Sequence, residues 1–309
     1  MDEFQVILKS RQFVRKTGIT SIPVDLERFA ASANAKIKVA NDLADDESGQ
    51  TTQIKGKNII IVNGNHREER QRFTVLHEIA HIILGLPSEH HGTRLTSSTL
   101  MSYGRRPQEE IFCDVFAAEC LLPYDLFVKD VSDLDISMAA VKELAEKYKA
   151  SITTTGSRFA LSANEPCAFV LSEDSYVRYV SRSKFLKEMK GWIDFNVPLP
   201  KESVAHRLVQ DSSKSEDYDT LPSHVWFNDG IRNRPLLAEE ALLLREWNQC
   251  LSLIRFDESM DSTHERCDED DDDQPLLKEL DGTLSWPSKS RPNNKPLWYE
   301  LLPVSKTPS

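Results

Sequence analysis

A short apolar segment that carries two histidines and a glutamate constrains this chain most. It runs from Arg72 to Gly85 and contains His77-Glu78-x-x-His81. Its apolar residues recur with the period of a buried helix, and the glycine ends that helix; they are Phe73, Leu76, Ala80, Ile83 and Leu84. Residues four apart share one face of a helix, so both imidazoles can reach a single ion. Because buried polar groups need partners, a metal site is expected here, and the alternative is a pair of hydrogen-bonded histidines without a metal.

Zinc is the ion that such a pair predicts. It takes two neutral imidazole nitrogens and a third protein ligand, and it leaves a fourth position open for water. Glu78 is adjacent to His77 and cannot easily share the ion. It is placed beside the open position, where a carboxylate can accept a proton from water. The pattern therefore predicts a zinc-dependent peptide hydrolase with Glu78 as its catalytic base.

A second predicted helix, Glu109 to Leu122, is expected to supply the third ligand. Its predicted apolar side consists of Ile111, Val115, Phe116, Ala118 and Leu122. Glu110 and Asp114 lie one turn apart, so one can bind the ion while the other accepts the free ring N–H of a ligating histidine. We assign Glu110 as the ligand and Asp114 as the orienting residue. Glu109 and Glu119 remain competitors, and each carboxylate could instead be solvated.

These two segments resemble a known family. The run RFTVLHEIAHIILG, followed by EEIFCDVFAAECLLP, is similar to the ImmA/IrrE metallopeptidases, whose members show a HExxH helix and then an ExxA(N/D)xFAAxLLMP helix. The resemblance implies a zincin-like core, zinc ligands at His77, His81 and Glu110, and a catalytic base at Glu78.

The resemblance extends from about Gly18 to Ala163 and has two departures. Cys113 stands where the family commonly has alanine, and Leu122-Pro123 lacks the usual methionine. Neither departure replaces a ligand. The resemblance also implies a narrow protein substrate, often a helix-turn-helix repressor encoded nearby, that is cleaved in a stress or mobile-element response.

Two other functions remain open from the sequence. A zinc-fold binding module could sequester a partner without proteolysis, as half of a toxin–antitoxin or repressor pair. A DNA-binding regulator could use residues 137–160, but a recognition helix needs basic residues, and the second helix of this pair offers Arg158 alone.

The expected fold class is α+β, in four parts. Residues 1–130 would form the zincin-like core, a small sheet with the HExxH helix and the glutamate-bearing helix. Residues 131–163 would form a helix-turn-helix-like extension. Residues 164–256 would form a smaller α+β domain, sensor-like by analogy with the family. Residues 257–309 would form an acidic, largely disordered tail.

The chain before the metal helix predicts a hairpin, with strands on either side of Gly56-Lys57. Its second strand, Ile59 to Val62, is a candidate edge for binding an extended peptide substrate. The alternative is a plain buried strand.

The connection from Leu86 to Pro107 shows no apolar periodicity and predicts a rim or lid. Its His90, His91 and Tyr103 are candidates to stabilise a developing oxyanion, and the alternative is exposed loop residues.

The C-terminal part has weaker signals. Residues 167–172, 176–181, 223–228 and 249–256 are expected as strands, and residues 185–192, 202–209 and 239–247 as helices.

Composition predicts a cytoplasmic, reduced protein. No apolar run approaches the ~20 residues that span a bilayer, the N-terminus lacks a basic-then-apolar leader, and five cysteines without repeated spacing argue against a disulfide framework. Cys113 and Cys120 are expected to pack in the core. Nearly all of the net charge of −11 lies in residues 257–281, which hold twelve acidic and two basic residues. Without a basic face, neither direct nucleic-acid binding nor a membrane partner is expected.

Overall fold

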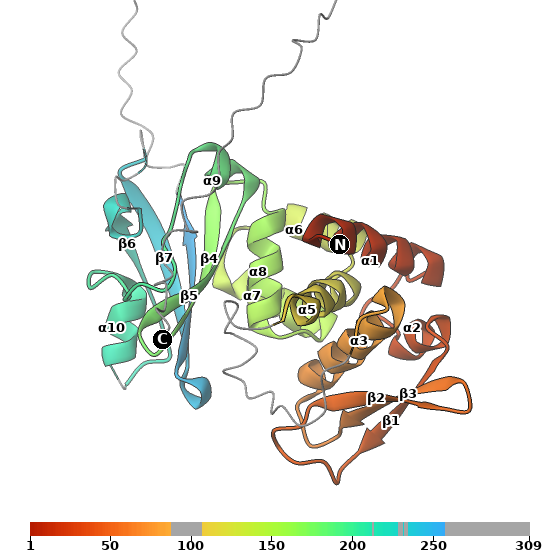
Figure 1. The fold of residues 1–309 in the computed structure, drawn as a ribbon. Helices are drawn as coiled ribbons and strands as arrows, with labels where there is room; N and C mark the ends of the chain where they lie inside the picture. Colours follow the sequence, from red (N-terminus) through yellow and green to blue (C-terminus); the bar gives the residue numbers. More distant parts are fainter. Residues whose placement is uncertain (88–106, 212, 228–230, 232–233, 257–309) are drawn as a thin grey trace, which may run out of the picture. The chain divides into compact units, whose positions relative to one another are not determined.

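The computed structural model describes residues 1–87, 107–211, 213–227, 231 and 234–256. The described residues all belong to one compact unit. That unit is an α+β structure with two sheets and helices packed against them (Figure 1). Among the described residues, no helix combines the length and the apolar character needed to cross a bilayer.

The N-terminal elements form a small sheet with helices. They are α1 (Glu3–Thr17), α2 (Leu26–Ser32), β1 (Ala35–Ala40), β2 (Gly49–Ile54), β3 (Lys57–Asn63) and α3 (Glu68–Leu84). The side chain of Asp2 caps the first turn of α1, and Gly18 ends it in the left-handed conformation that glycine adopts readily. Gly85 ends α3 in the same way. The predicted hairpin and metal helix are therefore present.

The order of the first sheet corrects one prediction. The strands are arranged β1-β3-β2, with β1 parallel and β2 antiparallel to β3. Ile59 to Val62 therefore lies in the central strand and cannot offer an edge to a peptide. Ile60 and Val62 are buried core residues, as the alternative interpretation expected. The hairpin signal identifies the neighbour on one side of β3, but no local signal indicates that β1 pairs on the other.

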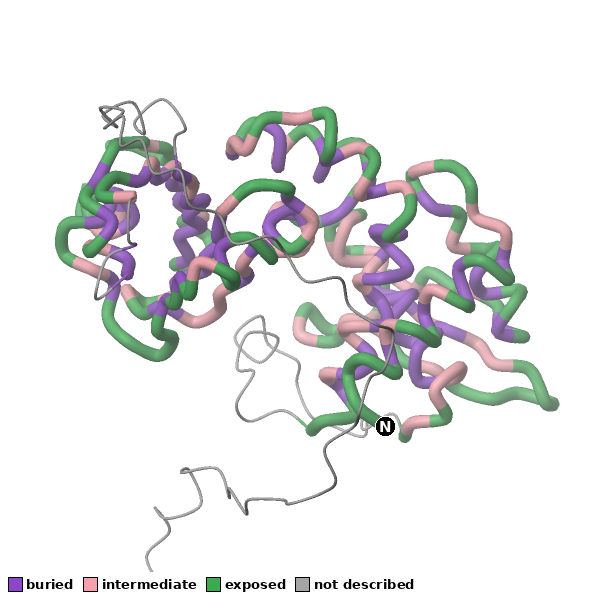
Figure 2. Tube along the Cα trace, turned by 90° about the horizontal axis from the view of Figure 1, so that it is seen from above, coloured by how far each residue is buried: buried purple, intermediate pink, exposed green. Residues whose placement is uncertain are grey.

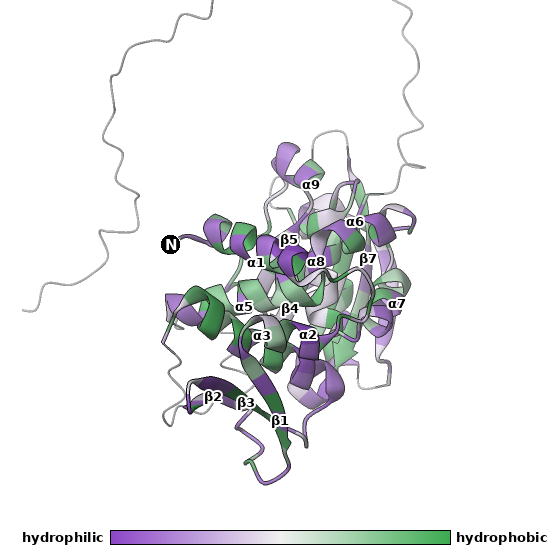
Figure 3. Ribbon diagram, turned by 90° about the vertical axis from the view of Figure 1, so that its right-hand side faces the viewer, coloured by the Kyte–Doolittle hydropathy of each residue, from purple (hydrophilic) through white to green (hydrophobic). Residues whose placement is uncertain are grey.

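Four helices follow among the described residues. They are α5 (Gln108–Leu121), α6 (Tyr124–Ser132), α7 (Met138–Tyr148) and α8 (Ile152–Ser162). The buried side of α5 differs from the predicted one, since Ile111, Val115 and Ala118 are only partly buried. Its fully buried residues include Cys113 and Cys120, which do pack in the core. The reason is that α5 packs against both α3 and α1, so its buried surface is wider than one apolar stripe. Figure 3 shows α5 coloured mostly hydrophobic, in contrast to the hydrophilic β2.

The second sheet is antiparallel, in the order β5-β4-β8-β7-β6. Its strands are β4 (Cys167–Glu173), β5 (Tyr176–Arg182), β6 (Glu216–Pro222), β7 (Leu236–Leu244) and β8 (Gln249–Arg255). Two short helices, α9 (Lys184–Glu188) and α10 (Val204–Gln210), and the 3-10 turns Ser223–Val225 and Arg245–Trp247 complete it.

Two predictions in this region were wrong. Residues 239–247, expected as a helix, are the second half of β7 and a 3-10 turn, and the strand expected from Ser223 begins as a 3-10 turn. The segment is rich in leucine, alanine and glutamate, which favour helices in isolation. Pairing with β6 and β8 on both sides overrides that preference.

The second sheet separates two hydrophobic cores. Phe169 and Leu171 of β4 pack in the core that also contains α3, α5 and α8, whereas Ala168 and Val170 pack in a second core with α10. Successive residues of a strand point to opposite faces, which explains this division. Figure 2 shows the resulting buried segments inside both halves of the described chain.

Candidate metal centre

Helix α3 carries three buried polar residues of the candidate site, His77, Glu78 and His81. Glu68 and Glu69 lie in its first turn, where negative charge favours the helix. Further along, His77 and His81 each retain 4% of their accessible surface, and Glu78 retains 1%. Such burial requires polar partners for all three side chains.

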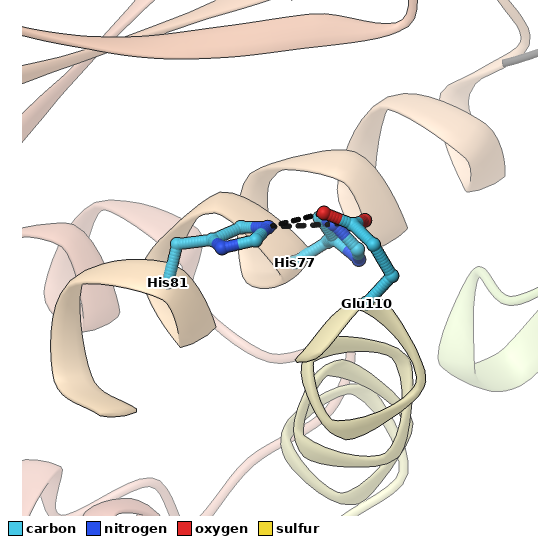
Figure 4. A group of neighbouring side chains, drawn as sticks. All are labelled: His77, His81 and Glu110. Carbon is cyan, nitrogen blue, oxygen red and sulfur yellow. Dashed lines mark hydrogen bonds and ion pairs between the residues drawn. The ribbon is translucent and has the colours of Figure 1, made fainter. Parts of the chain in front are cut away.

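Helix α5 brings Glu110 to the two histidines. Its Oε2 lies 3.2 Å from Nε2 of His77, and its Oε1 lies 3.5 Å from Nε2 of His81. The two Nε2 atoms lie 3.1 Å apart. Figure 4 shows the two rings from α3 and the carboxylate from α5 pointing toward one another. Among the described residues, this is the one cluster of three potential metal ligands.

The spacing of these atoms fits a tetrahedral ion. Zinc bonds of 2.0–2.1 Å at tetrahedral angles place neighbouring ligand atoms about 3.3 Å apart. The two Nε2 atoms lie 3.1 Å apart, close to that value, and one ligand atom from each of the three residues lies within 4.8 Å of the others. The donor set is two imidazole nitrogens and one carboxylate, which zinc accepts in catalytic sites. The residues present therefore fit a zinc ion, although the histidine contact alone is also compatible with a hydrogen bond.

Asp114 contacts the far side of the His77 ring. Its Oδ1 lies 2.9 Å from Nδ1 of His77. A hydrogen bond from Nδ1–H to this carboxylate leaves the lone pair of Nε2 directed at the ligand cluster.

The electrostatics of the site favour a cation. Burial acts to lower the pKa of His77, but its contacts with Asp114 and Glu110 and the charge of Glu78 outweigh burial and raise that pKa to about 10. A buried site with three carboxylates thus attracts positive charge to Nε2. A divalent cation can supply that charge by displacing the proton.

The structure adds a residue that the sequence analysis missed. The hydroxyl of Thr51 on β2 donates a hydrogen bond of 2.7 Å to Oε2 of Glu78. Thr51 is 27 residues from Glu78 in sequence, and nothing local indicates the contact, because it depends on which strand lies over α3.

The other candidate residues have different outcomes. Glu109 is exposed, and Glu119 is held by Arg11 at 2.9 Å and by Arg158, so neither belongs to the cluster. His90, His91 and Tyr103 lie outside the described residues, and their proposed roles are untested.

Comparison with known proteins identifies the segment around the site. Residues 31–159 match the model of the Peptidase_M78 family, described as the IrrE N-terminal-like domain. This segment belongs to the ImmA/IrrE family. The resemblance expected from the two helical motifs is confirmed.

Two curated relatives match part of this region. Both are named "Radiation response metalloprotease IrrE": the protein from Deinococcus radiodurans is 32% identical over 112 residues, and that from Deinococcus deserti is 31% identical over 112 residues. The matches cover 35% and 34% of this chain, and 32% and 36% of the two relatives. The chain therefore matches about one third of the length of each of these metalloproteases.

A solved structure extends the likeness in fold. A Mycobacterium tuberculosis transcriptional regulator superimposes with a TM-score of 0.55, covering 82% of this chain and 76% of that protein. The two are 13% identical in sequence, so this likeness concerns the fold alone.

Proposed function

We propose that this chain is a cytoplasmic, zinc-dependent endopeptidase of ImmA/IrrE type with a zincin-like core. His77, His81 and Glu110 would hold the ion, and Glu78 would act as the base. The observation that carries the proposal is the convergence of three ligand atoms, one each from His77, His81 and Glu110, within 4.8 Å of one another beside a buried glutamate. Membership of the surrounding segment in a metallopeptidase family supports the same activity.

The chemistry divides between the ion and the chain. A bound zinc ion supplies a Lewis acid for the scissile carbonyl and lowers the pKa of the attacking water. Glu78 accepts a proton from that water and passes it to the leaving amine nitrogen, as a general base and then a general acid. Asp114 keeps His77 in the tautomer that presents Nε2 as an acceptor. Burial of Glu78 keeps bulk water away from its carboxylate.

Strand β2 is the candidate peptide-binding edge. It is one of the two outer strands of the described sheet, next to β3, and its Thr51 contacts Glu78. An extended peptide that pairs with the main chain of β2 would be held beside the base. Alternating side chains of such a peptide would then point toward the ion.

The substrate is proposed to be a regulatory protein, such as a helix-turn-helix repressor encoded nearby, cleaved in a stress or mobile-element response. The printed name of the two relatives, a radiation response metalloprotease, supports a stress role. A direct DNA-reading role for α7 and α8 has little support. Residues of α8 pack against β4 and β5, and its Arg158 is held by Glu119.

Cleavage of the product of the neighbouring gene tests this function. Wild-type protein with zinc is expected to produce fragments, and a chelator is expected to stop it. Glu78→Gln should bind zinc and leave the product intact, whereas His77→Ala should lose both properties. An intact product in a stable complex with the wild-type, zinc-loaded protein would instead indicate a binding module that sequesters its partner.

A further inference from the structure

Strand β2 lies against α3 at a separation that glycine permits. A Cβ atom on Gly49 would stand 2.7 Å from Cγ2 of Thr74 on α3 and 2.6 Å from the carbonyl oxygen of Ile61 on β3. Carbon atoms do not approach other heavy atoms so closely, so a side chain at position 49 would collide with the main chain of β3 and with the Thr74 side chain of α3. Gly49 therefore permits β2 to lie close to both β3 and α3 at this point.

The same geometry brings Thr51 over Glu78. Thr51 lies two residues beyond Gly49 on the strand, and Glu78 lies about one turn beyond Thr74 on the helix. Two strand residues span about 6.6 Å and four helix residues about 6 Å. The spacing from Gly49 to Thr51 along β2 therefore matches the spacing from Thr74 to Glu78 along α3. Side chains two apart on a strand share a face. Glycine at 49 thus places the hydroxyl at 51 within 2.7 Å of Oε2 of Glu78.

We propose that Thr51 is a positioning residue for Glu78, a role that rests on the proposed peptidase function. Its hydroxyl donates to Oε2 and so orients the carboxylate that would transfer the proton. A β-branched side chain is stiff at χ1, so threonine holds its hydroxyl in one direction. This contact restricts rotation of the carboxylate.

A hydrogen bond of this kind acts on turnover more than on binding. The general base must lie within hydrogen-bond reach of the proton that it abstracts, and the two oxygens of a freely rotating carboxylate meet that condition only part of the time. Substrate affinity depends instead on the main chain of β2 and on the ion. Loss of the Thr51 hydroxyl should therefore lower kcat and leave KM nearly unchanged.

The test compares three purified full-length proteins: wild type, Thr51→Val and Thr51→Ser. Valine keeps the shape of threonine and removes the donor, whereas serine keeps the donor. With an internally quenched peptide that the wild type cleaves, Thr51→Val should lower kcat ~10-fold, the lower end of the effect of removing supporting contacts from a metal site. Thr51→Ser should recover most of that loss. Equal zinc content in all three proteins checks that the ligands are intact.

Crystal structures of the same proteins give a readout that does not depend on activity. In Thr51→Val, the Glu78 carboxylate should occupy a new or a second conformer while His77, His81 and Glu110 stay in place. Thr52→Val makes the same exchange on the opposite face of β2 and should leave the Glu78 conformer unchanged.

The outcomes are distinguishable. Wild-type turnover of Thr51→Val with an unmoved Glu78 overturns the role of Thr51 and leaves the peptidase function standing. A wild type that cleaves nothing contradicts the peptidase function, and the Glu78 conformer in Thr51→Val then reports whether Thr51 positions that carboxylate.

Discussion

At the scale of single residues, the ring of His77 is held from two sides. Glu110 and His81 approach Nε2, and Asp114 accepts from Nδ1. Asp114→Asn keeps the shape of the side chain and removes its charge. We expect zinc affinity to fall ~10- to 100-fold, the usual effect of losing such a partner. Competition with a chromogenic chelator measures that affinity.

The matched control for this prediction is Glu109→Gln. Glu109 lies on the same helix but is exposed, so its charge is well solvated. Zinc affinity should match that of the wild type. Equal affinities in Asp114→Asn and Glu109→Gln would show that Asp114 does not support His77.

Glu119 anchors α5 through a buried ion pair and gives stability a pH dependence. Burial acts to raise the pKa of Glu119, but Arg158 and Arg11 outweigh it and hold the pKa below its ordinary value of 4.5. A group whose pKa is depressed in the folded state stabilises the protein at pH values above its unfolded-state pKa. This stabilisation is lost as the pH falls through the folded-state pKa.

We therefore expect Glu119→Gln to lower the free energy of unfolding at pH 7 by about 3 kcal/mol, since it leaves buried arginine charge without its carboxylate. Urea titrations should show this difference shrinking as the pH falls below about 4.5. Asp125→Asn removes the exposed partner of Arg15 and should change stability by less than about 0.5 kcal/mol. A Glu119→Gln effect independent of pH would contradict the ionised carboxylate.

The sequence identified the residues whose spacing follows from a single helix. His77, Glu78 and His81 obey the helical period, and Glu110 with Asp114 obeys it on the next helix. Thr51 could not be predicted, because its contact with Glu78 depends on strand order and on the close approach at Gly49.

At the scale of elements, Gly156 fixes the packing of α8 on β4. A Cβ atom at this position would stand 2.2 Å from the ring of Phe169, which is fully buried. Gly156→Ala gains up to ~1 kcal/mol of helix propensity, but overpacking a core costs about 1–3 kcal/mol. We expect a net loss of stability in urea denaturation.

A second exchange tests the cause of that loss. If the clash with Phe169 is responsible, the double variant Gly156→Ala/Phe169→Leu should be more stable than the sum of the single changes predicts. Leu161→Ala, at an exposed position of α8, should have a small effect. Strict additivity of the two core changes would contradict the assigned contact.

Element type was harder to predict where propensity and pairing disagree. The leucine, alanine and glutamate residues of β7 favour a helix, yet β6 and β8 hold the segment as a strand. Strands β4 and β8 were predictable because they are buried on both faces. Such a strand is a continuous apolar run, whichever strands pair with it.

At the scale of the whole molecule, the second sheet contributes to the core around the candidate site. Phe169, Leu171, Leu242, Leu251 and Leu253 belong to the same hydrophobic cluster as residues of α3, α5 and α8. The proposed division at residue 163 therefore cuts through one core. A protein of residues 1–163 should expose that apolar surface and aggregate or unfold without a cooperative transition.

The matched protein is residues 1–256, which retains both cores. It should unfold in one cooperative thermal transition and elute from size-exclusion chromatography as a single species without aggregates. A soluble 1–163 protein with a sharp transition of its own would show that the peptidase segment is stable without the second sheet.

Metal content tests the central claim most directly. After incubation with zinc and gel filtration, elemental analysis should find about one equivalent per chain in the wild type and in Glu78→Gln. His77→Ala, His81→Ala and Glu110→Gln, each shown to be folded, should retain far less. A full equivalent in these three variants, or no zinc in the wild type, would contradict a single ion held by two histidines of α3 and one glutamate of α5.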